Sequence, residues 1–306
     1  MSLIRLEPAY QNYVWGGKRI SSYFQRALPM GKYAESWEVS DRSEGMSMVG
    51  SGHLQGKTFR EWLSIEKEKA VGIGKSWEKF PLLVKIIDSE EALSVQVHPD
   101  ETAAKQLGGE AKSEAWIALE KSPIYIGLKP GVTREQFIQE KDSKQIELLL
   151  NKIVLEKGES IYIPAGQIHA ICAGAFLLEI QQNSNTTYRV YDWERTGREL
   201  HWKEAVTAIN WTALTPLKTK PRLIQADEHH QRDRILSTPY FSVDRLEIKN
   251  HYQIKPDPNT CQILFCIEGS SLIDNQKSEP GMTYFISANA ELTSLKGSSQ
   301  WFLIRL

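Results

Sequence analysis

The segment ALSVQVHPD, residues 92–100, carries side chains whose types and spacing could hold a metal ion. Its apolar residues alternate with Ser94, Gln96 and His98, and a period of two predicts a strand with these polar groups on one face. If that face looks into a barrel, a divalent cation would satisfy Gln96 and His98 together. A polar stripe that faces solvent on an edge strand explains this segment equally well.

A second segment, GESIYIPAGQIHA at residues 158–170, could supply another imidazole. Gly158 suits the turn into a strand, and Pro164 and Gly166 suit a tight reversal. His169 then opens the returning strand, where its side chain is expected to point into the barrel. The two segments therefore predict one site built from distant parts of the chain.

Two cationic side chains lie in strongly apolar runs. On a period of two, Lys85 in PLLVKIID shares a face with Leu83 and Ile87. A buried lysine needs an anionic partner or a lowered pKa, although an ammonium that reaches solvent at the rim of the barrel explains the pattern nearly as well. Arg189 lies in TTYRVYDW, where a solvated arginine on an edge strand is the alternative.

The elements that must position these side chains are mostly short strands. Segments such as SIYIP and FLLEIQQ are rich in β-branched and aromatic residues and are separated by Gly, Pro, Asn or Asp. Frequent turns between short strands predict a mainly β barrel. Helices are expected near residues 58–70 and 100–110 and from Thr133 to Asn151, the last with a capping box of Thr133 and Gln136.

A polar connector, ADEHHQRDR, precedes a second β-rich block. We therefore predict a first domain at residues 1–234, with a helical insertion around 100–151, and a second, smaller β domain at 235–306. The second block echoes the Gly and Pro punctuation of the first but has no histidine at the position that matches His169. It is therefore expected to be free of metal.

Composition restricts the possible partners and compartments. The 306 residues include 37 basic and 38 acidic side chains, for a net charge of −1, so we expect neither nucleic acid nor an anionic membrane as a partner. No apolar run approaches a signal peptide or a membrane span, which predicts a cytoplasmic protein. The odd number of cysteines and the absence of a Cys-x-x-Cys pair predict reduced thiols in the core. We expect the remaining histidines at the surface: His53, His201, His229, His230 and His251.

The unit around His169 resembles the second motif of the cupin family, whose members bind metal inside a double-stranded β-helix. The implied partner motif is His-x-His with a downstream glutamate, and Gln96 stands here in place of the first histidine. This departure and KSEAW around Glu114 are more specific, because they resemble the short bacterial form of the type I mannose-6-phosphate isomerases, also called phosphomannose isomerases. The resemblance covers most of the chain through seven segments in the family's order: YVWGG, ESWEVSD, PLLVKIID, LSVQVHPDE, KSEAWIAL, IYIPAGQIHA and YRVYDWER.

The resemblance implies a cupin double-stranded β-helix with helical insertions and one zinc ion per chain. The implied ligands are Gln96, His98, Glu114 and His169. Such a set suits zinc but also iron, manganese or cobalt. A neutral amide binds zinc weakly, so Gln96 could instead hydrogen-bond another ligand.

The resemblance also implies roles in catalysis. Arg189 matches an active-site arginine and is expected to stabilise negative charge on an enediolate. Glu179 in FLLEIQQ matches an active-site glutamate and is our candidate base, with a metal-bound hydroxide or a lysine as alternatives. Lys112 is expected beside the reacting groups, while Lys85 and Ser94 are expected to bind the substrate.

The implied function is the interconversion of mannose 6-phosphate and fructose 6-phosphate by a zinc-dependent aldose–ketose isomerase. Its partner would be a phosphorylated sugar, and the chain would be a monomer or homodimer. Two alternatives remain at this point: a non-catalytic sugar-binding or regulatory cupin, and an iron-dependent cupin oxygenase.

Overall fold

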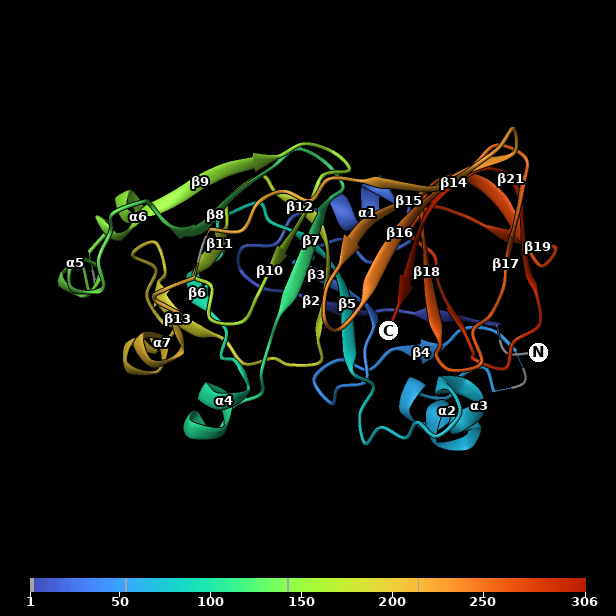
Figure 1. Ribbon diagram of the computed structural model, residues 1–306, viewed down its shortest axis with the longest axis horizontal. Helices are drawn as coiled ribbons and strands as arrows, with labels where there is room; N and C mark the ends of the chain where they lie inside the picture. The colour runs from blue at the N-terminus through green and yellow to red at the C-terminus, as the bar shows by residue number, and fades with distance from the viewer. Residues whose placement is uncertain (1–2, 53, 142, 214) are drawn as a thin grey trace. The chain divides into compact units, whose positions relative to one another are not determined.

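The computed structural model describes residues 3–52, 54–141, 143–213 and 215–306. Antiparallel strands make up most of its regular structure, and its helices are short (Figure 1). The mainly β class predicted from short apolar segments and frequent turns is confirmed. Within the described residues, no helix has both the length and the apolar character needed to cross a membrane.

Contacts divide the chain into two compact units. The site unit comprises Tyr10–Ser36 and Leu82–Lys218, and the terminal unit comprises Met1–Ala9, Trp37–Pro81 and Thr219–Leu306. The sequence-based boundary at residue 235 falls inside strand β15, which runs from His230 to Ser237. The contact-based division instead joins both ends of the chain in one unit, because strand β1 pairs with β20.

Two antiparallel sheets contribute strands to the site unit. The first has the order β10-β7-β12-β5-β3-β2, with unit boundaries inside β2 and β3, and the second has the order β13-β6-β11-β8-β9. The bounds are β2 (Ala9–Gln11), β3 (Glu35–Val39), β5 (Leu82–Asp88), β6 (Val95–Val97), β7 (Glu114–Ala118), β8 (Ser122–Leu128), β9 (Leu150–Leu155), β10 (Ser160–Ile163), β11 (His169–Ile171), β12 (Phe176–Gln182) and β13 (Tyr188–Tyr191).

A core of buried side chains lies between these two sheets. Ile87, Trp116 and Leu177 come from the first sheet, while Ile126 and Ile171 come from the second. Successive side chains of a strand point to opposite faces, so the residues at alternate positions of the same strands share this interior. The polar side chains discussed below occupy such positions.

Short helices pack on the outer face of the second sheet, except α1, which contacts β5 of the first sheet (Figure 1). The helices of the site unit are α1 (Arg19–Tyr23), α4 (Glu101–Leu107), α5 (Arg134–Gln139), α6 (Ile146–Leu149) and α7 (Trp202–Ala208). A second core packs residues of α5, α6 and α7 against the outer face of this sheet, including Phe137, Ile146 and Ala205.

The prediction of one continuous helix from Thr133 to Asn151 is wrong. The capping box of Thr133 and Gln136 is present, but the chain forms two short helices, α5 and α6, and Leu150 already begins β9. The described pairing of β9 with β8 explains the early end, because those residues satisfy their backbone groups in a sheet. The range 100–151 therefore holds strands as well as helices. Outside this range, the sequence patterns did not predict the short helices α1 and α7.

The terminal unit is built around one large sheet and two helices. The sheet order is β14-β15-β16-β21-β18-β20-β1-β4, with β17 on β21 and β19 on β18. The bounds are β1 (Leu3–Glu7), β4 (Met48–Val49), α2 (Phe59–Glu66), α3 (Glu68–Val71), β14 (Arg222–Ala226), β15 (His230–Ser237), β16 (Ser242–Ile248), β17 (His251–Ile254), β18 (Gln262–Ile273), β19 (Gln276–Ser278), β20 (Thr283–Ile286) and β21 (Thr293–Arg305). Whether this unit is a second cupin domain stays a prediction.

Candidate active site

One row of polar side chains crosses the first sheet of the site unit. Glu179 on β12 lies directly opposite Lys85 on β5 and opposite Trp116 on β7. Residues directly opposite each other in an antiparallel pair have Cβ atoms about 5 Å apart on the same face, so the register alone makes these three side chains neighbours. The next residue of β12 on the same face is Gln181, which lies directly opposite Glu114 on β7.

A second row crosses the other sheet. Gln96 on β6 lies opposite His169 on β11 and opposite Arg189 on β13. The turn before β11 also fixes the neighbouring strand, because the backbone N–H of Gly166 donates to the carbonyl of His98 at 2.7 Å. Gly166 has a φ of +83°, a conformation that a side chain disfavours, so the close approach requires glycine.

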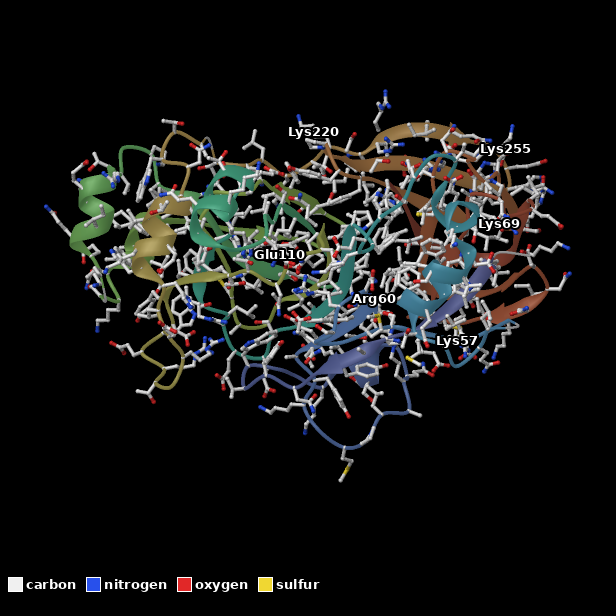
Figure 2. All side chains as sticks on the ribbon, turned by 90° about the horizontal axis from the view of Figure 1, so that it is seen from below. Lys57, Arg60, Lys69, Glu110, Lys220 and Lys255 are labelled. Carbon is white, nitrogen blue, oxygen red and sulfur yellow. The ribbon has the colours of Figure 1, made fainter. Side chains whose placement is uncertain are left out.

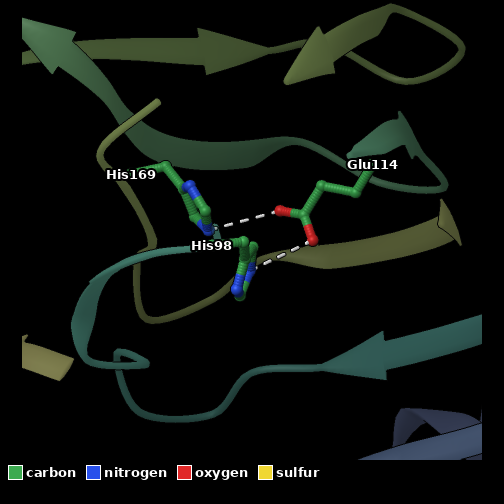
Figure 3. A group of neighbouring side chains, drawn as sticks. All are labelled: His98, Glu114 and His169. Atoms are coloured by element: carbon green, nitrogen blue, oxygen red, sulfur yellow. Dashed lines mark ion pairs between the residues drawn. The ribbon is translucent and has the colours of Figure 1, made fainter. Parts of the chain in front are cut away.

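The carboxylate of Glu114, on the first sheet, contacts His98, which follows β6, and His169 on β11 of the second sheet. Its Oε2 lies 3.4 Å from His98 Nε2, and its Oε1 lies 3.3 Å from His169 Nε2 (Figure 3). All three residues are about 1% exposed. Each has a ligand atom within 4.8 Å of those of the other two, an arrangement that could hold a metal ion.

The donor set fits a divalent cation. Ligand atoms bound tetrahedrally at about 2.1 Å lie about 3.4 Å apart, close to the separations seen here. His98 and His169 engage the carbonyls of Thr186 and Gln167 through Nδ1, at 2.9 and 2.8 Å, which leaves each Nε2 lone pair directed at the group. His98 Nε2 and Glu114 Oε1 are buried without a hydrogen-bond partner in the described chain, and Glu114 Oε2 has only the ion pair with Lys112 besides the imidazoles. A cation would satisfy these atoms.

The electrostatics keep these groups in their metal-binding forms. Burial and the ammonium of Lys112 lower the pKa of His98 to about 3, and burial also lowers the pKa of His169. Burial opposes ionisation of Glu114, but the ammonium of Lys112 outweighs it and holds the pKa of Glu114 well below its usual value. Two neutral imidazoles and one carboxylate are therefore ready at neutral pH.

Gln96 lies beside the group rather than within the His–Glu–His triangle. Its Nε2 lies 3.3 Å from His169 Nε2, and its Oε1 accepts a hydrogen bond from Ser94 Oγ at 3.2 Å. The oxygen and nitrogen of a glutamine side-chain amide exchange places when the amide turns by half a revolution about the Cγ–Cδ bond. That rotation would present the oxygen to a cation next to His169.

A cavity of about 280 Å³ adjoins this group. Gln96 and Lys112 line the cavity and also contact the group, Lys112 through its Nζ at 3.0 Å from Glu114 Oε2. The other lining residues are Tyr13, Trp15, Glu35, Lys85, Ile87, Leu93, Ser94, Ile171, Glu179, Asn185, Thr187, Arg189 and Arg198. The structure thus brings every residue of the predicted site to one cavity or to the group beside it.

Lys85 forms a paired cluster in the wall of this cavity. It is 5% exposed, and its Nζ lies 3.1 Å from Glu179 Oε1 and 3.5 Å from Glu35 Oε2. Burial disfavours the ammonium, but these two carboxylates outweigh burial and raise the pKa above its ordinary value. Trp116 Nε1 donates to Glu179 Oε2 at 2.8 Å, so both oxygens of Glu179 contact the protein. Lys85 is therefore a fixed cation that does not extend to solvent.

Arg189 and Arg198 line the same cavity, but their surroundings differ. Arg198 pairs with Asp192 at 2.8 Å through Nε, whereas Arg189 Nε has no hydrogen-bond partner among the described residues. Burial, followed by the nearby Arg198, lowers the pKa of Arg189 from its ordinary value. An unpaired guanidinium in a cavity is suited to bind an anionic oxygen.

Sequence reasoning missed Glu35 and Arg198. Glu35 lies in ESWEVSD, a segment quoted only for its family resemblance, and every residue of β3 is buried, so alternation does not mark one face. A partner for Lys85 was expected, however, and a search for acidic residues in the other quoted segments would have included Glu35. Arg198 lies outside any strand, beyond the reach of periodicity.

The cysteines and the remaining histidines, to which the sequence analysis gave no role, differ in burial. Cys172, Cys261 and Cys266 are buried and free, as predicted. The surface expectation is wrong for His230, which is 7% exposed because β17 covers it and its ring lies 4.6 Å from that of Tyr252. His251 is exposed, His201 and His229 are half-buried, and His53 lies outside the described residues.

These features define a cupin-type β protein with a candidate metal centre. Comparison with known proteins agrees. A model of the family described as "Phosphomannose isomerase type I, catalytic domain" matches residues 3–140. "Probable mannose-6-phosphate isomerase GmuF" of Bacillus subtilis (strain 168) is 32% identical, with 97% of each chain covered. The chain belongs to the type I phosphomannose isomerase family.

Two further relatives support the same assignment. "Mannose-6-phosphate isomerase" of Streptococcus mutans is 32% identical over 82% of this chain and 80% of its own. A crystal structure of the mannose 6-phosphate isomerase from Bacillus subtilis superposes with a TM-score of 0.91 at 29% identity and covers 100% of both chains. The family and the fold therefore extend over the whole length of the chain.

Proposed function

We propose that this protein interconverts mannose 6-phosphate and fructose 6-phosphate. The observation that carries the proposal is the buried His98–Glu114–His169 group beside a cavity lined by both cations and carboxylates. The names of the relatives supply the substrate, since several are called mannose-6-phosphate isomerases. Moving a carbonyl between neighbouring carbons requires a proton to leave one carbon and arrive at the other, and the cavity holds groups suited to both tasks.

The proposed cofactor is one zinc ion held by His98, Glu114 and His169, with Gln96 as a fourth ligand after rotation of its amide. When bound, the ion supplies Lewis-acid polarisation of the substrate's carbonyl and hydroxyl oxygens. Lys112 has a different task in this scheme. Its ammonium keeps Glu114 ionised and points a cation into the cavity, where it can stabilise oxygen that becomes negative.

Arg189 is the proposed partner of the enediolate. Its Nε is unpaired, it lines the cavity, and it lies opposite Gln96 in the sheet register. A guanidinium stays protonated and can bridge two oxygens at once, so it suits a substrate whose C1 and C2 oxygens share negative charge. Its role is electrostatic and involves no proton transfer.

Glu179 is the proposed group that accepts and returns the proton. Lys85 and Trp116 hold its two oxygens at 3.1 and 2.8 Å, so the carboxylate has one orientation. A fixed carboxylate at the cavity wall can take a proton from one carbon and deliver it to the adjacent one. Lys85 and Ser94, which also line the cavity, are proposed to bind sugar oxygens.

The test combines metal analysis with a coupled assay for fructose 6-phosphate. We expect the purified protein to carry close to one metal ion per chain, to lose turnover with a chelator and to regain it with zinc. Consumption of oxygen with iron would instead identify an oxygenase. Binding of mannose 6-phosphate without turnover, in metal-loaded protein, would identify a sugar-binding module and contradict the proposal.

A further inference from the structure

A second cavity, of about 390 Å³, lies in the terminal unit. It is lined by Gln225, His230, Arg232, His251, Tyr252, Gln253, Ile254, Lys255 and Arg305. No aspartate or glutamate occurs among these described lining residues, although two arginines, a lysine and two histidines do. The proposed isomerase chemistry uses none of them.

The cations of this cavity share one buried carboxylate. Asp244 is fully buried, and it accepts from Arg232 Nε at 2.7 Å and from Arg305 Nη1 at 2.8 Å. Arg234 donates to its other oxygen. Arg232 Nη1 also donates to the hydroxyl of Tyr252 at 3.3 Å, which fixes the guanidinium at the cavity.

The charges in this cluster do not balance. Three guanidiniums converge on the single negative charge of Asp244, and Lys255 adds another positive charge at the cavity. Burial and the nearby guanidinium of Arg232 lower the pKa of Arg305 from its ordinary value, whereas Asp244 outweighs burial and raises the pKa of Arg232, so Arg305 is the guanidinium that Asp244 compensates least. A bound anion would relieve this repulsion.

His230 adds a buried ring nitrogen that lacks a partner. The side chain is 9% exposed, and its Nδ1 lies 3.0 Å from Asp227 Oδ1. Its Nε2 is buried without a hydrogen-bond partner in the described residues. This ring nitrogen could pair with a phosphate oxygen or with the hydroxyl of a hydrogen phosphate, according to the tautomer.

We infer that this cavity binds a phosphate group, either as free phosphate or as a small phosphate monoester. Two features favour a phosphate over a singly charged carboxylate. The positive charge in excess matches a dianion, and guanidinium, ammonium and imidazole side chains from separate segments of the unit line one cavity. The volume also exceeds what inorganic phosphate alone would fill, which leaves room for the rest of a small ester.

Equilibrium dialysis with labelled inorganic phosphate tests the inference. The H251Q/K255Q double variant removes two exposed cavity side chains that no ion pair fixes, so the fold should survive. We expect it to bind phosphate at least about tenfold more weakly than the wild type, because it loses two side chains that can donate to the anion. The matched control is K69Q, an exposed lysine of the same unit outside this cavity; Figure 2 labels both Lys69 and Lys255.

Two further arms separate this site from the proposed active site and identify the ligand. R189A should retain the phosphate binding that H251Q/K255Q loses, and H251Q/K255Q should keep wild-type isomerase turnover. Competition by glycerol 3-phosphate at lower concentration than phosphate would identify an ester, and the reverse order would identify free phosphate. Wild-type binding by the double variant, loss of all binding in R189A, or no binding by the wild type would each overturn the inference.

Discussion

Each unit places one fully buried carboxylate at the centre of a cluster, but the partners differ in kind. Glu114 faces two imidazoles, whose Nε2 atoms offer lone pairs, whereas Asp244 faces three guanidiniums, which offer only N–H groups and permanent positive charge. The proposed ligand of the first cluster is therefore a metal cation, and that of the second is an anion. The neighbours of a buried carboxylate therefore decide the sign of the ligand that completes its cluster.

The largest effect should follow from removing the charge of the first carboxylate. Glu114→Gln keeps the shape but loses an anionic ligand, so we expect metal content to fall to background and turnover to fall by about a thousandfold or more. Elemental analysis and the coupled assay measure both. Glu156→Gln, an exposed carboxylate of the same unit, is the control and should behave as the wild type. Full metal content in Glu114→Gln would show that the imidazoles alone suffice.

The next effect separates charge stabilisation from metal binding in the first cluster. Arg189→Ala should retain the metal and lose about a hundredfold to a thousandfold in turnover, the loss typical of removing one preorganised donor to a developing anion. Arg189→Lys should recover only part of this activity, because an ammonium cannot bridge two oxygens. Wild-type rates in Arg189→Ala would rule out the proposed role.

The third effect is a loss of stability when the carboxylate of the second cluster is neutralised. Asp244→Asn leaves three crowded guanidiniums without their shared anion, so we expect the free energy of unfolding to fall by about 3 kcal/mol. Urea unfolding measures this change, and Asp274→Asn, at an exposed position in the turn between β18 and β19, is the control. Added phosphate should restore more stability to Asp244→Asn than to the wild type. Equal effects on both proteins would argue that the guanidiniums are not short of an anion.

The smallest effect is the pH dependence of the stability that Asp244 contributes. Burial opposes ionisation of Asp244, but Arg234, Arg305 and Arg232 together lower its pKa in the folded protein. Its contribution to stability is therefore complete above the unfolded pKa of about 3.9 and is lost as pH falls through the lower folded value. We expect the urea midpoint to fall below about pH 4 more steeply in the wild type than in Asp244→Asn. Parallel curves would contradict this assignment.

Local pattern predicted the parts of the candidate site that lie within single segments. The alternation in ALSVQVHPD placed Ser94 and Gln96 on one face, and both side chains line the cavity. The Gly and Pro spacing before His169 placed that residue at the start of a strand, where β11 begins. These inferences needed only the period of a strand and the chemistry of a turn.

The parts that failed depend on pairing between distant segments. Glu35 reaches Lys85 through a sheet order that no local pattern encodes, and His230 is buried by residues that follow it by about twenty positions. The helix expected from Thr133 to Asn151 ends early because the backbone after Leu149 pairs with β8. In each case a tertiary contact outweighed the local preference.

The register of β6, β11 and β13 has a consequence for how the chain tolerates changes in length. Val95, Val97 and Ala170 pack against the helices on one face, while Gln96 and His169 serve the other. Inserting one residue within these strands would exchange the two sets, sending apolar side chains to the reacting groups and imidazole into the packing layer. Added or deleted residues should therefore be accepted in the connections between strands, such as the one that carries α5 and α6, and rejected within the strands themselves.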